Sequence, residues 1–161
     1  MTSGQKHDKA TIYLCVPFAL LTGILFGKFS GIIAGAAFIV SGLWLSPDLD
    51  IYSKSLKRWG ILKFVWFPYR KMIGHRSYLS HGPFIGSAIR ITYILLIAYA
   101  VQIIFQFLGI DIRFISISQL IELIEKFPKQ IFSIIIGIEA SAWLHIFLDG
   151  DPLPIEWNKK K

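Results

Sequence analysis

Four long apolar segments constrain this chain of 161 residues more than any other feature. They cover residues 14–26, 32–45, 83–108 and 131–148. Only 17% of the residues are charged and the mean hydropathy is +0.57, whereas a soluble domain carries roughly 25% charged residues. The pattern predicts an all-α integral membrane protein, folded as one domain over residues 1–161, with a bundle of about four helices.

The first two apolar segments are separated by Gly27, Lys28 and a further glycine at position 31, which predicts a helical hairpin. Each arm is shorter than the roughly 20 residues that a full crossing prefers. The hairpin is therefore expected to thin the bilayer, to tilt little or to be partly re-entrant. A cleaved signal peptide is the competing interpretation, but no A-x-A site closes the first apolar segment.

Four crossings place both termini and residues 46–82 on one side of the membrane. That side carries 12 basic residues. The other side carries four, which are Lys28, Arg113, Lys126 and Lys129. Basic residues concentrate on the cytoplasmic side, so we expect a multi-pass protein of the plasma membrane with both termini in the cytoplasm. The basic residues lie beside apolar segments, so a membrane surface explains the net charge of +7 and no nucleic-acid partner is expected.

Two shorter segments are predicted to lie outside the crossings. Residues 59–69 are apolar, flanked by basic residues and too short to cross, which favours a segment in the cytoplasmic membrane interface, with a loop folded over the helices as the alternative. All five tryptophans fall near this face. Residues 109–130 mix charges with apolar residues at helical spacing, which predicts an amphipathic external helix.

The predicted topology brings all four histidines and several aspartates to the cytoplasmic side. Cys15 is the single cysteine, so a cysteine-rich zinc site is excluded and a metal would need imidazole and carboxylate donors. These donors suit zinc, manganese or iron, with zinc or manganese preferred. The predicted metal ligands are His7, Asp48, Asp50, His75, His81, His145 and Asp149, with Asp8 a weaker candidate.

Each part of this set also has a simpler interpretation. His145 and Asp149 are four residues apart and could form only a local pair at a helix end. Asp48 and Asp50 could solvate a helix end or act as an N-cap. His75 and His81 could be a pH-responsive or lipid-headgroup pair. Together they favour a metal, because carboxylates and imidazoles at a membrane face are costly to desolvate unless paired or metal-bound.

Two charged residues fall inside the later apolar segments. Arg90 lies about two turns into the third segment, and Glu139 lies within the fourth. They are expected to pair as structural glue between helices. The alternative is that Arg90 holds an anionic group of a substrate.

The order of the motifs resembles a known family. His7-Asp8, Pro47-Asp48-x-Asp50, His75-Arg76-x4-His81 and His145-x3-Asp149 look like those of small bacterial metal-binding membrane proteins. More distantly, the last three motifs are similar to those of the YdjM-type membrane-bound metal-dependent hydrolases, although Ile51 stands where that group often has a histidine. The resemblance implies a membrane-embedded divalent-metal site, with hydrolysis as the associated activity.

The spacing His-x3-Asp near a membrane also resembles lipid phosphatases of the phosphatidic-acid type. In those enzymes an arginine lies six residues before the histidine, but this chain has Glu139 there, so this class is rejected. The sequence predicts a divalent-metal-binding membrane protein that hydrolyses an ester or phosphoester, or one in which the metal only staples the helices. An open coordination position beside a cleft would favour the enzyme, and a closed shell of four donors would favour the staple.

Overall fold

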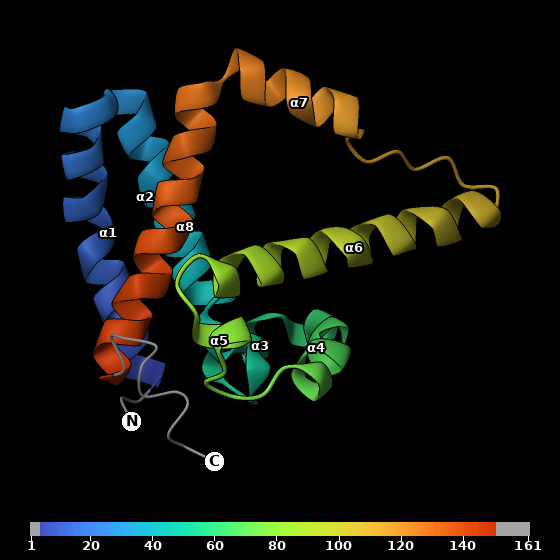
Figure 1. The fold of residues 1–161 in the computed structure, drawn as a ribbon, viewed down its shortest axis with the longest axis horizontal. Helices are drawn as coiled ribbons and strands as arrows, with labels where there is room; N and C mark the ends of the chain where they lie inside the picture. The colour runs from blue at the N-terminus through green and yellow to red at the C-terminus, as the bar shows by residue number, and fades with distance from the viewer. Residues whose placement is uncertain (1–3, 151–161) are drawn as a thin grey trace.

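The computed structural model describes residues 4–150, and these residues are helical with short connections (Figure 1). Four helices are long and apolar enough to cross a membrane, which confirms the predicted all-α class. They are α1 (Gly4–Phe26), α2 (Lys28–Trp44), α6 (Ile85–Phe107) and α8 (Pro128–Asp149). The shorter helices are η1 (Pro47–Asp50), α3 (Lys54–Arg58), η2 (Gly60–Trp66), α4 (Phe67–Met72), α5 (Tyr78–His81) and α7 (Ile117–Lys126).

Helices α1 and α2 form the predicted hairpin, but both are longer than the apolar pattern suggested. Gly27 alone breaks the helix, with φ at 97°, a conformation that a residue with a Cβ rarely adopts. At the other end, α1 extends back to Gly4 and so includes the polar residues His7 and Asp8. Helix α1 has 23 residues, enough for a full crossing, whereas α2 has 17 and the stretch from Lys28 to Asp50 reaches 23 residues only when η1 is included.

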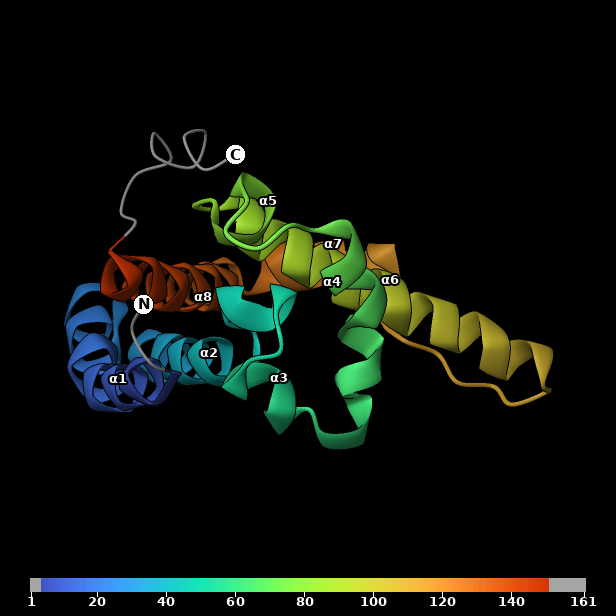
Figure 2. The same ribbon diagram turned by 90° about the horizontal axis from the view of Figure 1, so that it is seen from below.

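Small residues let α2 lie between α1 and α8 at close range (Figures 1 and 2). A Cβ at Gly31 would lie 2.4 Å from the carbonyl oxygen of Ala19 in α1. A Cβ at Gly137 would lie 2.4 Å from the carbonyl oxygen of Ala34. Backbone contact of this kind is a common way to pack apolar helices where the hydrophobic effect gives little driving force.

Helix α6 diverges from this three-helix bundle. It begins beside the middle of α8 and extends away from it, and α7 returns the chain to the start of α8 (Figure 1). Only 6% of the apolar span of α6 is buried, against 44% of the span from Lys28 to Asp50. The amphipathic helix predicted within residues 109–130 is confined to α7, where the side chain of Ser116 accepts the backbone N–H of Gln119 as an N-cap.

The short helices between α2 and α6 have a small core of their own. Leu49, Leu56, Trp66 and Tyr69 are buried together, and Tyr93 of α6 packs against the last two rings. Trp66 was expected at the membrane boundary with the other tryptophans, but its side chain turns inward and anchors η2 to α4. Trp157 lies outside the described residues. Burial raises the pKa of the Tyr69 hydroxyl, which therefore stays neutral at physiological pH.

Candidate metal centre

Imidazoles and carboxylates from distant parts of the chain meet at the end of the bundle where α8 finishes. Helix η1 supplies Asp48, α5 supplies His81, and the last turn of α8 supplies His145 and Asp149. One donor atom from each of these four residues lies within 4.8 Å of every other. These four residues, which the sequence analysis expected on the same side of the membrane, therefore form one cluster.

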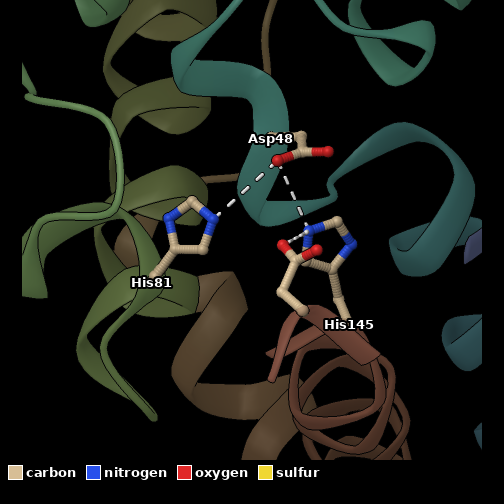
Figure 3. Close-up of side chains that lie close together, drawn as sticks. Asp48, His81 and His145 are labelled. Atoms are coloured by element: carbon tan, nitrogen blue, oxygen red, sulfur yellow. Dashed lines mark ion pairs between the residues drawn. The ribbon is translucent and has the colours of Figure 1, made fainter. Parts of the chain in front are cut away.

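Asp48 lies between the two histidines of this cluster. Its Oδ1 atom is 3.4 Å from Nε2 of His145 and 3.8 Å from Nε2 of His81 (Figure 3). The same Nε2 atom of His145 is 3.5 Å from Oδ2 of Asp149. His81 and His145 are 4% and 5% exposed, so water does not compensate for weak contacts between these groups.

The two contacts of His145, at 3.4 and 3.5 Å, fit a shared cation better than hydrogen bonds, and the 3.8 Å contact of His81 is also too long for a hydrogen bond. A hydrogen bond from nitrogen to oxygen is about 2.7 to 3.2 Å long. Bonds of roughly 2.0 to 2.2 Å to a tetrahedral ion instead leave the donor atoms about 3.3 to 3.6 Å apart. The buried Nε2 atoms of His81 and His145 have no hydrogen-bond partner. An imidazole nitrogen left unpaired beside a carboxylate is costly without an ion between them, so the donor set fits a divalent metal.

Local sequence fixes Asp48 in place. Ser46 caps η1, its hydroxyl oxygen accepting the backbone N–H of Asp48 at 3.4 Å, and Pro47 occupies the first turn, where no N–H is needed. The same hydroxyl lies 3.3 Å from Nδ1 of His145. Ser46 is 2% exposed and so orients a carboxylate of η1 and an imidazole of α8 at once.

Ser80 determines which nitrogen of His81 carries the proton. Its Oγ lies 3.2 Å from the carbonyl oxygens of Gly74 and Ser77, which can accept its only hydrogen. The same Oγ lies 2.9 Å from Nδ1 of His81, and it acts there as the acceptor. Nδ1 therefore carries the hydrogen, and the lone pair of His81 is on Nε2, the atom that faces Asp48.

His7 reaches the centre from α1 through Asp149. Its Nε2 donates to Oδ1 of Asp149 at 3.1 Å, which leaves Oδ2 directed at His145. The rings of His7 and His145 stack, with centroids 4.0 Å apart and planes 20° from parallel. His7, predicted as a ligand or as a partner that supports the ligands, contacts one carboxylate and one imidazole of the cluster in this arrangement.

Asp50 and His75 form a second group that shares His81. The carboxylate of Asp50 is fully buried and accepts Nδ1–H of His75 at 3.0 Å, while its Oδ2 lies 3.5 Å from Nδ1 of His81. The backbone N–H of Arg76 also donates to this carboxylate, and Arg76 has φ at 57°, an uncommon value for a residue other than glycine. Carboxylates often hold histidine ligands in this way, so Asp50 fits an orienting role as well as a ligand role.

Three further residues named in the sequence analysis make other contacts around the cluster. Asp8 belongs to a separate ion-pair group with Lys54 and Arg58, because the face of α1 that carries it meets α3. Arg90 donates to the carbonyl of Ser80 and not directly to Glu139. Glu139 accepts the backbone N–H of Phe84, so the two charges tie the start of α6 separately to α5 and to α8.

Sequence reasoning missed Ser46 and Ser80. Each serine stands close in sequence to a predicted ligand, Ser46 two residues before Asp48 and Ser80 directly before His81. That proximity was the available signal, but serine is common at helix starts for reasons unrelated to metals.

Comparison with known proteins agrees with this geometry. The chain is 39% identical over 61 residues to an uncharacterized protein of Aquifex aeolicus (strain VF5); the match covers 37% of this chain and 43% of the relative. No solved structure matches the chain. The family described as uncharacterized metal-binding protein (DUF2227) matches residues 2–160. The chain therefore belongs to this family of metal-binding proteins.

Proposed function

We propose that this membrane protein binds one divalent metal ion through Asp48, His81, His145 and Asp149. The observation that carries the proposal is the pair of buried Nε2 atoms, on His81 and His145, that face the same oxygen of Asp48 without a hydrogen bond. Two imidazoles and two carboxylates form a donor set that zinc accepts readily, and manganese is the second choice.

The arrangement best supports a structural role, in which the ion staples the helices. The four donors come from η1, α5 and α8, elements that are far apart in sequence. α8 belongs to the three-helix bundle, whereas α5 leads directly into the diverging α6 (Figure 1). Three of the four donor residues are less than 8% exposed at the side chain, and Asp48 is 19% exposed, as in a closed shell.

A specific observation keeps hydrolysis of an ester or phosphoester as the second candidate. The side chain of His75 is 29% exposed while Asp50 holds it beside the cluster, so one imidazole next to the donor set meets solvent. A divalent ion supplies activated water in metal-dependent hydrolases. The distant resemblance to YdjM-type hydrolases supports the same candidate.

Metal analysis of the detergent-purified protein tests metal binding, which both candidate functions require. One equivalent of zinc or manganese is expected for the wild-type chain, and none for the double variant His81→Ala/His145→Ala. Full metal content in the double variant would disprove the assigned donor set. The metal-loaded protein is also assayed with phosphoester and lipid-ester substrates. Turnover that is lost in His75→Gln, while this variant keeps its metal, would favour the enzyme. Stabilisation of the protein by metal without turnover would favour the structural role.

A further inference from the structure

Helices η2 and α4 present a surface that the metal centre does not explain. Its apolar side chains project into solvent: Ile61 is 84% exposed, Phe64 70% and Met72 80%. The basic residues Lys63 of η2 and Lys71 of α4 belong to the same two helices, and Lys57 precedes them in α3. We call these six residues the basic-apolar surface.

The surface carries charge of one sign. Residues 51–83 contain seven lysines and arginines and no aspartate or glutamate. Lys54 and Arg58 are paired with Asp8 of α1, and the three lysines of the basic-apolar surface are absent from the ion pairs among the described residues. Lys63 lies 5.6 Å from the ring centroid of Phe64, and Lys71 lies 4.7 Å from that of Phe67. Lys63 and Lys71 therefore lie directly beside exposed apolar rings, and Lys57 lies 5.3 Å from the ring centroid of Tyr52.

The core beneath this surface holds it in place. Trp66 and Tyr69 point inward and are 0% and 1% exposed, and the hydroxyl of Tyr93 in α6 donates to the carbonyl of Val65. Helices α3 and α4 lie at the level of the bundle end that carries the metal centre (Figure 1). That level is a boundary of the apolar part of the bundle, because α1, α2 and α8 extend from it in one direction.

We propose that the basic-apolar surface binds the headgroups of anionic phospholipids, with Ile61, Phe64 and Met72 inserted among the acyl chains. Lysines beside apolar side chains at a membrane boundary match a negative headgroup layer above hydrocarbon. Nucleic acid would satisfy the lysines, but it would leave the aliphatic side chains of Ile61 and Met72 in water.

Native mass spectrometry of the delipidated, full-length protein tests this proposal. The protein is titrated separately with phosphatidylglycerol and phosphatidylcholine in the same detergent. The test variant is Lys57→Gln/Lys63→Gln/Lys71→Gln. The matched control, Lys28→Gln/Lys126→Gln/Lys129→Gln, removes the same charge from exposed lysines at the opposite end of the bundle. Metal content and melting temperature are measured for all proteins, so that loss of folding is recognised.

We expect wild-type protein to prefer phosphatidylglycerol and the test variant to lose this preference by about tenfold or more, since each lysine near a headgroup contributes about fivefold. The control variant should keep the preference, and higher salt should weaken it. Equal binding of both lipids, an equal loss in the control, or stronger binding of a DNA duplex than of phosphatidylglycerol through the same lysines would overturn the proposal. If the triple variant melts early, Lys71→Glu alone must show the loss.

Discussion

The imidazole of His7, near the start of α1, stacks on that of His145, near the end of α8, with centroids 4.0 Å apart. His7 also donates to Asp149, so it has two distinct contacts with the candidate donor set. His7→Phe keeps the stacked ring and removes the hydrogen bond, whereas His7→Ala removes both. We predict metal affinities in the order wild type, His7→Phe, His7→Ala, measured by competition with a chelator. Equal affinity of all three proteins would show that His7 does not orient the site.

Loss of a single donor should empty the centre. Replacing Asp48 or His81 with alanine removes one of four donors and leaves a poorly satisfied shell, so each variant should lose most of the bound metal. Elemental analysis after gel filtration measures the content. Asp111→Ala is the control, because Asp111 is exposed and its ion pair is with Arg113, away from the cluster. A variant that keeps full stoichiometry would remove its residue from the donor set.

Ser80 should affect metal affinity although it does not face the ion. Ser80→Ala removes the acceptor that holds the proton on Nδ1 of His81, so the Nε2 lone pair is no longer fixed toward Asp48. We predict an affinity loss of about 10- to 100-fold, the usual range for groups that orient a ligand. Ser118→Ala in the exposed helix α7 should leave affinity unchanged. Equal affinities for the two variants would contradict the tautomer argument.

Close backbone packing should make Gly137 sensitive to a methyl group. A Cβ there would lie 2.4 Å from the carbonyl oxygen of Ala34 and 2.8 Å from the Cβ of Ala37. Gly137→Ala should destabilise the protein by about 1 to 3 kcal/mol, as overpacking does. Gly74→Ala is the control, since its Cβ would meet nothing within 4 Å. Thermal melting in detergent distinguishes the two, and a variant as stable as the control would disprove the close packing.

The basic residues predict a topology that reporter fusions can test. A fusion at Lys161 should report the cytoplasm, and one between Gly109 and Ile117 should report the other side. The reason is the excess of lysine and arginine on the side of the termini. A C-terminal reporter on the outer side would contradict the four-crossing topology.

The sequence predicted the parts of the site that depend on topology. Apolar segments of membrane length placed Asp48, His81 and His145 at one end of the helices, and the structure brings them together there. Distances within the cluster were not predictable, because they depend on the short helices η1 and α5 and on the hydroxyls of Ser46 and Ser80, which contact the imidazoles of His145 and His81. The apolar pattern also could not show that α1 continues through His7, since that turn is stabilised by polar partners from distant segments.

The direction of α6 could likewise not be predicted from the sequence. Its apolar residues are spread around the helix rather than gathered on one side, so no apolar face marks a packing partner. Arg90 and Glu139 were expected to join α6 and α8 as a pair. Arg90 donates to the hydroxyl of Ser87 and to the carbonyl of Ser80, and Glu139 accepts the backbone N–H of Phe84. Backbone groups can come from any residue type, so a sequence pattern does not reveal the last two partners.

Because α6 diverges, the three helices α1, α2 and α8 pack together without the residues that connect α2 to α8. We call these connecting residues the excursion. The bundle and the excursion are then two cooperative units, and the Asp48, His81, His145 and Asp149 cluster lies where they meet. Amide exchange in α5 and in the first turn of α6 should depend on metal occupancy, whereas exchange in the middle of α2 should follow only the bundle. The affinity of the centre would in that case set how often the two units open independently of each other.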